Sequence, residues 1–466
     1  MLEKIISVAN DALYTYVLII LLVLGGTYFT FRTRFAQIRL LGQQFKSVTE
    51  KSDKNGVSSF QALMVSTASR VGTGNIIGVA TALCVGGFGS VFWMWVIAVI
   101  GAASAFVEST LAQIYKKRGA DGFFGGPAYY IEAATKRKGL AIVFSVFLIL
   151  TYGFGFNMLA SYNLQSTFSS YSFYDAEYTP WIIGFVIAAL VCYCLIGGGK
   201  RIISVTSLLV PVMGAIYIAV AVVLSIINAK MLPDVFRQIF AGAFDFEAIF
   251  GGFTGSCIMY GIKRGLFSNE AGVGSAPNAS AAADVSHPVK QGLVQILSVF
   301  IDTVLVCSST AFMCMTSGVT PPGSSDQAAA YVQSALSATL GDIGPVFITV
   351  AMVLFAFTTL LGNLFYVDKT INYLFGKEPG KAVRNICYVV ASLVIFVGAG
   401  LNAELLWGVA DITMGGMTLI NMPVILYLGK YAIRALKDYE QKLKSGAEIT
   451  FNKKDIGLSH ETDCWN

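Results

Sequence analysis

The sequence STASRVGTGNIIGVATAL (residues 66–83) belongs to an apolar run that is long enough to enter a lipid bilayer. Arg70, Asn75 and three glycines interrupt this run near its middle. A spanning helix satisfies its backbone hydrogen bonds internally, so a break in the hydrocarbon region frees N–H and C=O groups that need other partners. The stretch therefore predicts a discontinuous membrane helix with a function at its break.

The composition of the whole chain favours a membrane location. Of the 466 residues, 55% are hydrophobic and only 13% are charged, whereas soluble domains carry about 25% charged residues. Long apolar runs with few charges are typical of polytopic membrane proteins. The first run, residues 12–31, is longer than the apolar part of a secretory signal and lacks a small-residue cleavage site, so we expect it to be retained.

With about 20 apolar residues for each crossing, the sequence contains eleven candidate spans and predicts an all-α membrane protein. The spans cover residues 12–31, 61–83, 89–114, 141–168, 181–196, 203–229, 247–283, 290–316, 344–375, 384–400 and 404–428. Lysine and arginine favour the cytoplasmic side, and with the N-terminus outside, 26 of the 32 fall in inner segments. This predicts a cytoplasmic C-terminus, and it explains the net charge of +5 without nucleic-acid binding.

Apart from the first span, the remaining spans form two halves of five that each begin with a broken helix. The first break lies in RVGTGNIIG (70–78) and the second in CIMYGIKRGLFSNEAGVGSAP (257–277). Glycine-interrupted spans at matching positions of two halves are typical of inverted-repeat transporters with the binding site at the breaks. The expected division is 1–55 for the extra helix and a linker, 56–230 and 231–430 for the repeats, and 431–466 for a cytoplasmic tail, partly ordered from about residue 435.

The chemistry of the first break suits a small zwitterion beside a cation. N–H groups at the start of a half-helix, where the dipole is positive, suit a carboxylate, and freed carbonyls suit a cation. Gly72 and Gly74 allow the unusual backbone and a close approach. Gly74 and Gly78 also match a GxxxG helix-packing motif, which is the simpler interpretation of this segment alone. A dinucleotide-binding loop would need a βαβ context, which the sequence lacks.

Other functional classes have less support. The sequence has no GxxxxGK[ST] phosphate loop, which argues against an ATP-driven pump. The two histidines and eight cysteines match no nucleophile or metal-ligand pattern, so we expect no enzymatic activity and no cofactor. An ion channel is a remote alternative, because a channel would not need paired broken helices.

Several motifs resemble those of the alanine/glycine:cation symporter family, also known as the sodium:alanine symporter family. They are RVGTGNIIGVATAL, GGFGSVFWMW (86–95), GGPAYYIE (125–132), KRGLFSNEAGVGSAP (263–277), HPVKQG (287–292), FIDTVLVCSSTA (300–311) and FAFTTLLG (355–362), in family order. The resemblance implies a LeuT-type fold of five plus five inverted helices with one extra N-terminal helix. It also implies Na⁺-coupled, sometimes proton-coupled, uptake of a small neutral amino acid across a plasma membrane. We expect a monomer that binds the amino acid and Na⁺.

The resemblance implies positions for both ligands. The amino-acid carboxylate meets the backbone amides of Thr73 and Gly74, while Gly261 and Ile262 line the pocket from the second break. The implied Na⁺ ligands are the carbonyls of Ala68 and Val71, the hydroxyls of Thr358 and Thr359 and, as a weaker candidate that could instead support the break, Asn75.

The sequence departs from the family pattern in two helices. Within NMLASYNL (157–164), Ala160 stands where the family has Gln, and Tyr162 where it has Asn; Asn363 stands where the family has Trp. The loss of large side chains predicts a wider, more polar pocket that accepts serine, threonine or glutamine. Alternatively, Tyr162 or a neighbouring aromatic residue refills the space, and alanine and glycine stay preferred.

Charged residues inside the spans are functional candidates by default. Arg70 lies at the first break, and Lys263, Arg264 and Glu270 lie in the second broken segment. The opposite charges around Glu270 are within two helical turns of it, so we interpret them as neutralising partners that fix the broken helices.

Overall fold

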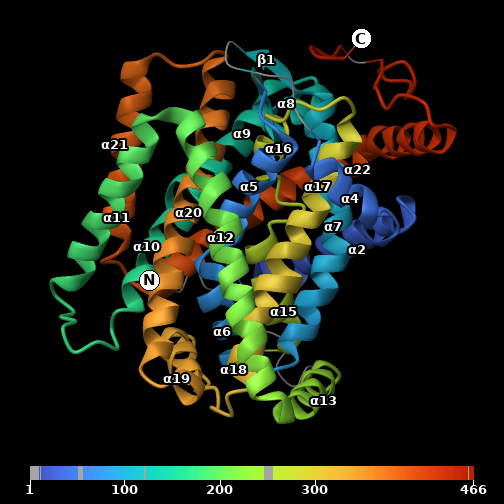
Figure 1. Ribbon diagram of the computed structural model, residues 1–466. Helices are drawn as coiled ribbons and strands as arrows, with labels where there is room; N and C mark the ends of the chain where they lie inside the picture. Colours follow the sequence, from blue (N-terminus) through green and yellow to red (C-terminus); the bar gives the residue numbers. More distant parts are fainter. Residues whose placement is uncertain are drawn as a thin grey trace.

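The computed structural model describes residues 10, 12–50, 56–119, 122–245, 256–459 and 461–465, and helices dominate these parts (Figure 1). The elements of the first part are η1 (Leu13–Leu18), α2 (Ile19–Arg32), α3 (Ala36–Arg39), α4 (Leu41–Val48), α5 (Ser59–Arg70), η2 (Gly74–Gly78), α6 (Val79–Gly86), α7 (Ser90–Ile114), β1 (Lys117–Gly119), β2 (Gly122–Phe124), α8 (Pro127–Thr135), α9 (Lys138–Leu148), η3 (Ile149–Gly155), α10 (Phe156–Ser166), α11 (Thr179–Ile196) and α12 (Gly198–Ile227). β1 and β2 form a small antiparallel hairpin.

The second part of the chain, from residue 229 on, is also helical. Its elements are η4 (Ala229–Met231), α13 (Leu232–Ala243), α15 (Cys257–Asn269), α16 (Pro277–Ser280), α17 (Pro288–Val299), η6 (Phe300–Cys307), α18 (Ser308–Met315), α19 (Ala328–Leu340), α20 (Ile343–Phe375), α21 (Lys381–Gly398) and α22 (Ala403–Ser445).

Membrane-length helices account for most of the structure. Among the described residues, eight helices are long and apolar enough to cross a membrane, and the bent pair formed by α5 and η2–α6 counts as a ninth. The structure is therefore mostly helical, with eight or nine apolar helices of membrane-spanning length. Each predicted apolar run contains a helix, but the number of eleven crossings stays a prediction.

The helices form a buried centre surrounded by apolar outer helices. In α7 and the α17–α18 segment, 67% and 72% of the most apolar window is buried, compared with 28% in α12 and α21. α21 pairs with α11 at one edge of the molecule (Figure 1). Large apolar side chains such as Phe185, Leu208 and Ile386 are more than 60% exposed on these outer helices. Such an apolar surface suits lipid contact.

The molecule has two ends that differ in their elements. α13 and α19 lie at one end, which we call the α19 end, whereas the hairpin and α8 lie at the other, the α8 end (Figure 1). Inside the molecule the two discontinuous segments meet, because Ser69 near the end of α5 donates a hydrogen bond to Glu270, which follows α15.

The first break follows α5. The side chain of Ser58 accepts a hydrogen bond from the Gln61 amide, and the Gln61 side chain accepts one from the Ser58 amide, which fixes the start of this helix. The helix ends at Arg70 because Val71 adopts an extended conformation with ψ of 93°. α5 and η2–α6 then meet at an angle of 53°. The discontinuous helix predicted from residues 66–83 is confirmed.

The second break lies further along than we predicted. α15 runs through Gly261 and Ile262 without interruption and ends at Asn269; the next residue, Glu270, has a left-handed φ of 54°. A Cβ atom on Gly261 would lie 2.5 Å from the Ser90 carbonyl oxygen, so this glycine allows α15 to pack on α7. The break instead spans Glu270 to Ala276, where Gly272 and Gly274 have φ of 84° and 89°. The break thus lies within the predicted segment 257–277, but the placement of Gly261 and Ile262 at the break is wrong. That these two residues line the substrate pocket stays a prediction.

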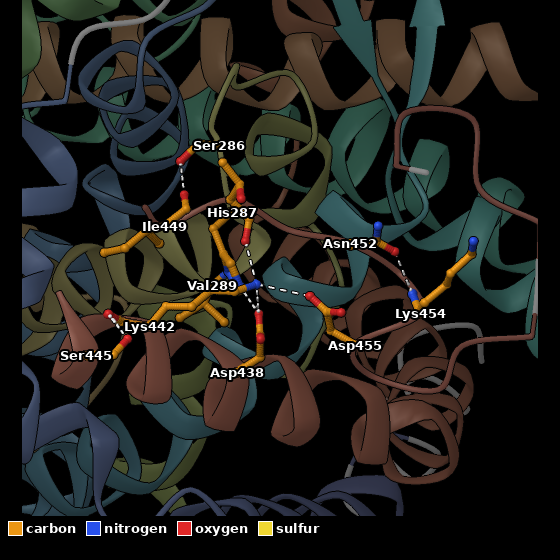
Figure 2. A network of polar contacts seen from close by, with 11 residues as sticks. Ser286, His287, Val289, Asp438, Lys442, Ser445, Ile449, Asn452, Lys454 and Asp455 are labelled. Carbon is orange, nitrogen blue, oxygen red and sulfur yellow. Dashed lines mark hydrogen bonds and ion pairs between the residues drawn. The ribbon is translucent and has the colours of Figure 1, made fainter. Parts of the chain in front are cut away.

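The C-terminal tail is more ordered than we predicted. α22 continues to Ser445, and the following chain folds back onto the α8 end. Figure 2 shows part of this contact: Lys442 Nζ lies 2.8 Å from Asp438 Oδ2 and 3.1 Å from Asp455 Oδ2, and Asp438 also contacts His287. Further on, Trp465 donates to the Gln113 carbonyl over 2.8 Å.

Candidate functional site

Oxygen atoms of α5 and α20 converge at the first break. The Thr359 hydroxyl donates to the carbonyl of Ala68 over 3.1 Å and lies 3.4 Å from the carbonyl of Val71. These carbonyls belong to the end of a half-helix, where the dipole is negative. Unwound carbonyls and half-helix C-termini are the groups that coordinate Na⁺ in transporters with broken helices. Three of the predicted cation ligands are thus brought together.

Glycine makes this approach possible. A Cβ atom on Gly72 would lie 2.1 Å from Thr359 Oγ1, far closer than any side chain tolerates. One turn further along α20, a Cβ atom on Gly362 would lie 2.5 Å from the amide nitrogen of Ser69. Both glycines let α20 lie directly on the backbone of α5.

Thr358 points elsewhere. Its hydroxyl donates to the Leu354 carbonyl of its own helix over 2.9 Å and contacts the Met213 sulfur atom at 3.5 Å. Hydroxyl groups on membrane helices commonly bond their own backbone in this way. The structure does not place Thr358 with the Thr359 group of oxygens.

Asn75 joins the first break to η6 and to α15. Its side-chain oxygen accepts from the Gly72 amide over 2.7 Å, and its nitrogen donates to Asp302 Oδ1 over 2.7 Å. Ser268 of α15 donates to the other Asp302 oxygen over 2.8 Å. Asn75 is fully buried. Of the two roles we considered, the geometry fits support of the break.

The amides of Thr73 and Gly74 lie at the start of η2, where the second half-helix begins. Asn163 of α10 donates from Nδ2 to Thr73 Oγ1 over 3.1 Å. A Cβ atom on Gly74 would lie 2.8 Å from the Phe267 ring, so this ring covers the glycine. Phe267 is itself packed between Phe156 and Trp407, with ring centroids 4.5 and 4.7 Å away.

The α10 side of the site differs from the prediction. Ala160 is buried, and Asn163, one helical turn later, is the residue that reaches Thr73. Our reasoning considered Tyr162 and missed Asn163, although the spacing of three residues from Ala160 places both on one helix face. Asn363 forms internal contacts instead of lining an open space: its Oδ1 lies 2.7 Å from Ser69 Oγ, and its Nδ2 donates to Asn157.

The intramembrane charges pair differently from our interpretation. The Glu270 carboxylate accepts from Ser69 over 3.1 Å and from Ser275 over 2.7 Å. Lys263 pairs with Asp411 of α22 at 2.8 Å, and Arg70 donates to Gln295 over 2.8 Å. In the described part of the chain, hydroxyl groups and not lysine or arginine make the direct contacts to Glu270.

A cavity of about 800 Å³ opens at the α19 end and leads toward the first break. It reaches Asn163, the partner of Thr73, and its wall includes Lys263, Arg264, Trp407 and Asp411. The candidate site therefore combines a group of oxygens that could hold a cation, the amides at the start of η2 and a cavity that leads to them from one end of the molecule.

Comparisons with known proteins show the family of the chain. Residues 1–453 match the model of the sodium:alanine symporter family. The chain is 41% identical to the "Amino-acid carrier protein AlsT" of Bacillus subtilis over 99% of this chain and 97% of the relative. It is 40% identical to the "Probable sodium/glutamine symporter GlnT" of the same organism, over 100% and 96%. It is 35% identical to the "Sodium/alanine symporter AgcS" of Methanococcus maripaludis, over 96% and 99%.

A solved structure supports the fold. The crystal structure of MhsT in complex with L-phenylalanine superposes with a TM-score of 0.59 over 84% of this chain and 93% of MhsT, at 16% sequence identity. At this identity the similarity concerns the fold, which is of the LeuT type.

Proposed function

Because the chain belongs to the sodium:alanine symporter family, we propose that it is a secondary symporter that couples inward Na⁺ flux to the uptake of a small neutral amino acid of the alanine and glycine class. Transport proceeds by alternating access around the two breaks. One elementary charge that moves through 100 mV gains about 2.3 kcal/mol. A single Na⁺ could therefore concentrate a neutral zwitterion roughly fiftyfold before its chemical gradient is counted.

One observation carries the proposal: the Thr359 hydroxyl meets the carbonyls of Ala68 and Val71 at the broken end of α5. These atoms form the proposed Na⁺ site, with Thr358 as a further ligand only if its hydroxyl turns toward them. The amino-acid carboxylate binds the amides of Thr73 and Gly74 once Phe267 has moved off the glycine. Ala160 and Asn163 of α10 face the substrate. Asn363 does not face it but supports α10 through its hydrogen bond to Asn157.

The proposed topology has eleven crossings: one N-terminal helix followed by two inverted halves of five. The N-terminus and the α19 end face outward, and the α8 end faces the cytoplasm. The lysine and arginine residues support this orientation, because Lys116, Lys117, Arg118 and the basic tail gather at the α8 end. The protein would then reside in the plasma membrane and act as a monomer.

Two finer alternatives keep the same fold. Coupling could use protons, and the substrate could be a larger polar amino acid such as serine, threonine or glutamine. The name of the 40% identical relative, a probable sodium/glutamine symporter, favours testing the second alternative. Asn163 supplies the amide that could bind a polar substrate side chain.

Uptake into proteoliposomes tests the proposal when amino acid and cation are varied independently. Wild-type protein should accumulate labelled alanine in response to an inward Na⁺ gradient. Thr359→Ala should raise the Na⁺ concentration for half-maximal uptake at least tenfold, and Thr358→Ala should raise it less. Uptake that follows a pH gradient without Na⁺ would favour proton coupling. Unchanged Na⁺ dependence in both variants would refute the cation site.

A further inference from the structure

Arg264 presents unused hydrogen-bond donors to the cavity at the α19 end. Its side chain belongs to α15 and lines the cavity, although the residue is only 6% exposed. Among the described residues, Nε and Nη1 have no acceptor. A guanidinium group has five N–H donors and no acceptor, and buried charged donors without partners are unfavourable. Within the described part of the chain these donors have no acceptor, and they lie in the wall of the cavity, so a molecule in the cavity can supply one.

The acidic groups nearby do not fill this role. Asp411, the buried carboxylate in the cavity wall, contacts Lys263 at 2.8 Å and Asn10 Nδ2 at 3.3 Å, both through Oδ2. Its Oδ1 has no hydrogen-bond partner among the described residues, so it does not accept from Arg264. Asp326 and Glu404 belong to the exposed rim of the cavity. Of the two described cations in this wall, Lys263 is paired with Asp411, whereas Arg264 has no ion pair with a described residue.

Trp407 holds the guanidinium in a fixed orientation. The Arg264 Cζ atom lies 3.9 Å from the centroid of the Trp407 ring, which is stacking distance. Stacking uses the flat face of the guanidinium and leaves the donors at its edge available. A planar fork of donors matches the two oxygens of a carboxylate.

The position of Arg264 relates it to the first break. On α15, Arg264 and Phe267 are one helical turn apart, and they face two glycines that are also one turn apart on the η2 segment. A Cβ atom on Gly78 would lie 3.9 Å from Arg264 Cδ, and one on Gly74 would lie 2.8 Å from Phe267 Cε1. The guanidinium is thus about one turn, some 5 Å, closer to the cavity mouth than the proposed carboxylate site.

We propose that Arg264 and Trp407 form an outer subsite that binds the carboxylate of the arriving amino acid before it reaches the amides of Thr73 and Gly74. The carboxylate passes from the guanidinium to the amides when Phe267 leaves Gly74. This inference rests on the proposed function, because it takes the amino acid as the substrate. The outer subsite is a second binding position for the amino acid. Binding there requires a free carboxylate on the amino acid but does not require Na⁺.

Trp407 fluorescence in Na⁺-free buffer separates this subsite from the central site. We expect L-alanine at millimolar concentration to change the fluorescence of the purified protein, whereas L-alaninamide, which has the same ammonium and side chain but no carboxylate, does not. Gly74→Val should keep the response, and Arg264→Gln should lose it. Trp407→Phe identifies the source of the signal among the five tryptophans.

Control variants distinguish a specific loss of binding at Arg264 from misfolding of the protein. Arg237→Gln makes the same change in charge at a 79% exposed side chain of α13, at the same end of the molecule, and should behave like wild type. Arg264→Lys keeps the charge without the planar fork and should respond only at severalfold higher alanine concentration. In uptake assays, Arg264→Gln should lower kcat/KM about tenfold with the maximal rate retained.

An equal response to alanine in Arg264→Gln, an equal response to alaninamide, or a response that disappears in Gly74→Val would overturn the outer subsite. The signal is read without Na⁺ and without transport. Failure of the subsite can therefore be distinguished from failure of Na⁺-coupled uptake in the wild-type protein.

Discussion

Gly72 controls how closely Thr359 approaches the first break. In Gly72→Ala, the new Cβ atom would lie 2.1 Å from Thr359 Oγ1, so the hydroxyl must move away from the carbonyls of Ala68 and Val71. We expect this variant to raise the Na⁺ concentration for half-maximal uptake about tenfold or more, equivalent to at least about 1.4 kcal/mol. Gly42→Ala, at a position with open space around it, is the control. Equal Na⁺ dependence in the two variants would contradict the proposed cation site.

Asn163 provides a test of substrate preference. Its amide contacts Thr73 and lines the cavity, so removal of this amide should weaken polar substrates more than alanine. For Asn163→Ala we expect serine and glutamine to lose about tenfold in competition with labelled alanine, within the 1–3 kcal/mol that one pocket contact contributes. An unchanged ranking of unlabelled amino acids would show that Asn163 does not select the substrate.

The sequence predicted some of these residues and misplaced others for a physical reason. Ala68, Val71 and Thr359 were predicted through the family resemblance, and the structure brings them together. Gly261 was misplaced because a glycine that allows helix packing looks the same in a sequence as one that breaks a helix. The contact of Gly261 with α7 joins distant parts of the chain, so the local sequence does not reveal it. A usable signal was present nonetheless: Gly272-Val-Gly274 repeats the glycine spacing of Gly72-Thr-Gly74.

The second break depends on glycines with left-handed backbone. Gly274 has φ of 89°, and a Cβ atom there would lie 2.9 Å from Asn421 Cγ. Gly274→Ala should therefore destabilise the protein by about 1–3 kcal/mol. Gly214→Ala, inside α12 with open space around it, should be neutral or up to about 1 kcal/mol more stable. Thermal unfolding in detergent compares the two, and similar shifts would argue against backbone strain at the second break.

Whole helices were more predictable than their irregular parts. The length of an apolar run is a local property of the sequence, so α7, α20 and the other long spans fall where predicted. The π-helical turns η3 and η6 were not predicted, because an extra residue in a helical turn leaves the apolar composition of the span unchanged. The extension of α22 to Ser445 was also missed, since its charged end contacts the tail, for example through the ion pair of Lys442 with Asp455.

The tail joins segments that are distant in the sequence. Ile449 accepts a hydrogen bond from Ser286 over 2.6 Å, and the Phe451 ring lies 5.2 Å from the rings of both His287 and Trp465. Arg118 donates from its amide to Asp463 over 2.8 Å. The tail thus connects α7, α22 and the segment before α17 at the α8 end. The composition indicated only a charged, partly ordered tail. It could not predict these contacts, because they form only after the helices have assembled.

His287 makes attachment of the tail dependent on pH. Its Nδ1 accepts from the Val289 amide over 3.2 Å and its Nε2 lies 3.1 Å from Asp438 (Figure 2), so the neutral ring carries its proton on Nε2. Burial lowers the pKa of His287 below 6.5; Asp438 opposes this shift, and Lys442 and Lys290 add to it. A protonated ring would also lose the bond from Val289, because Nδ1 could no longer accept.

The sign of the pH effect follows from this lowered pKa. When the tail is detached and His287 is exposed, the ring binds a proton more readily, so the attached form is stable above pH 6.5 and weakens below it, by at most about 1.4 kcal/mol per pH unit. We expect iodide to quench Trp465 more strongly as the pH falls from about 7.5 to 5.5, with Trp465→Phe as the background. His287→Gln retains an acceptor for Val289 and a donor for Asp438 but does not titrate, so its quenching should change little across this range. The same pH profile in His287→Gln and wild type would assign the effect to another group.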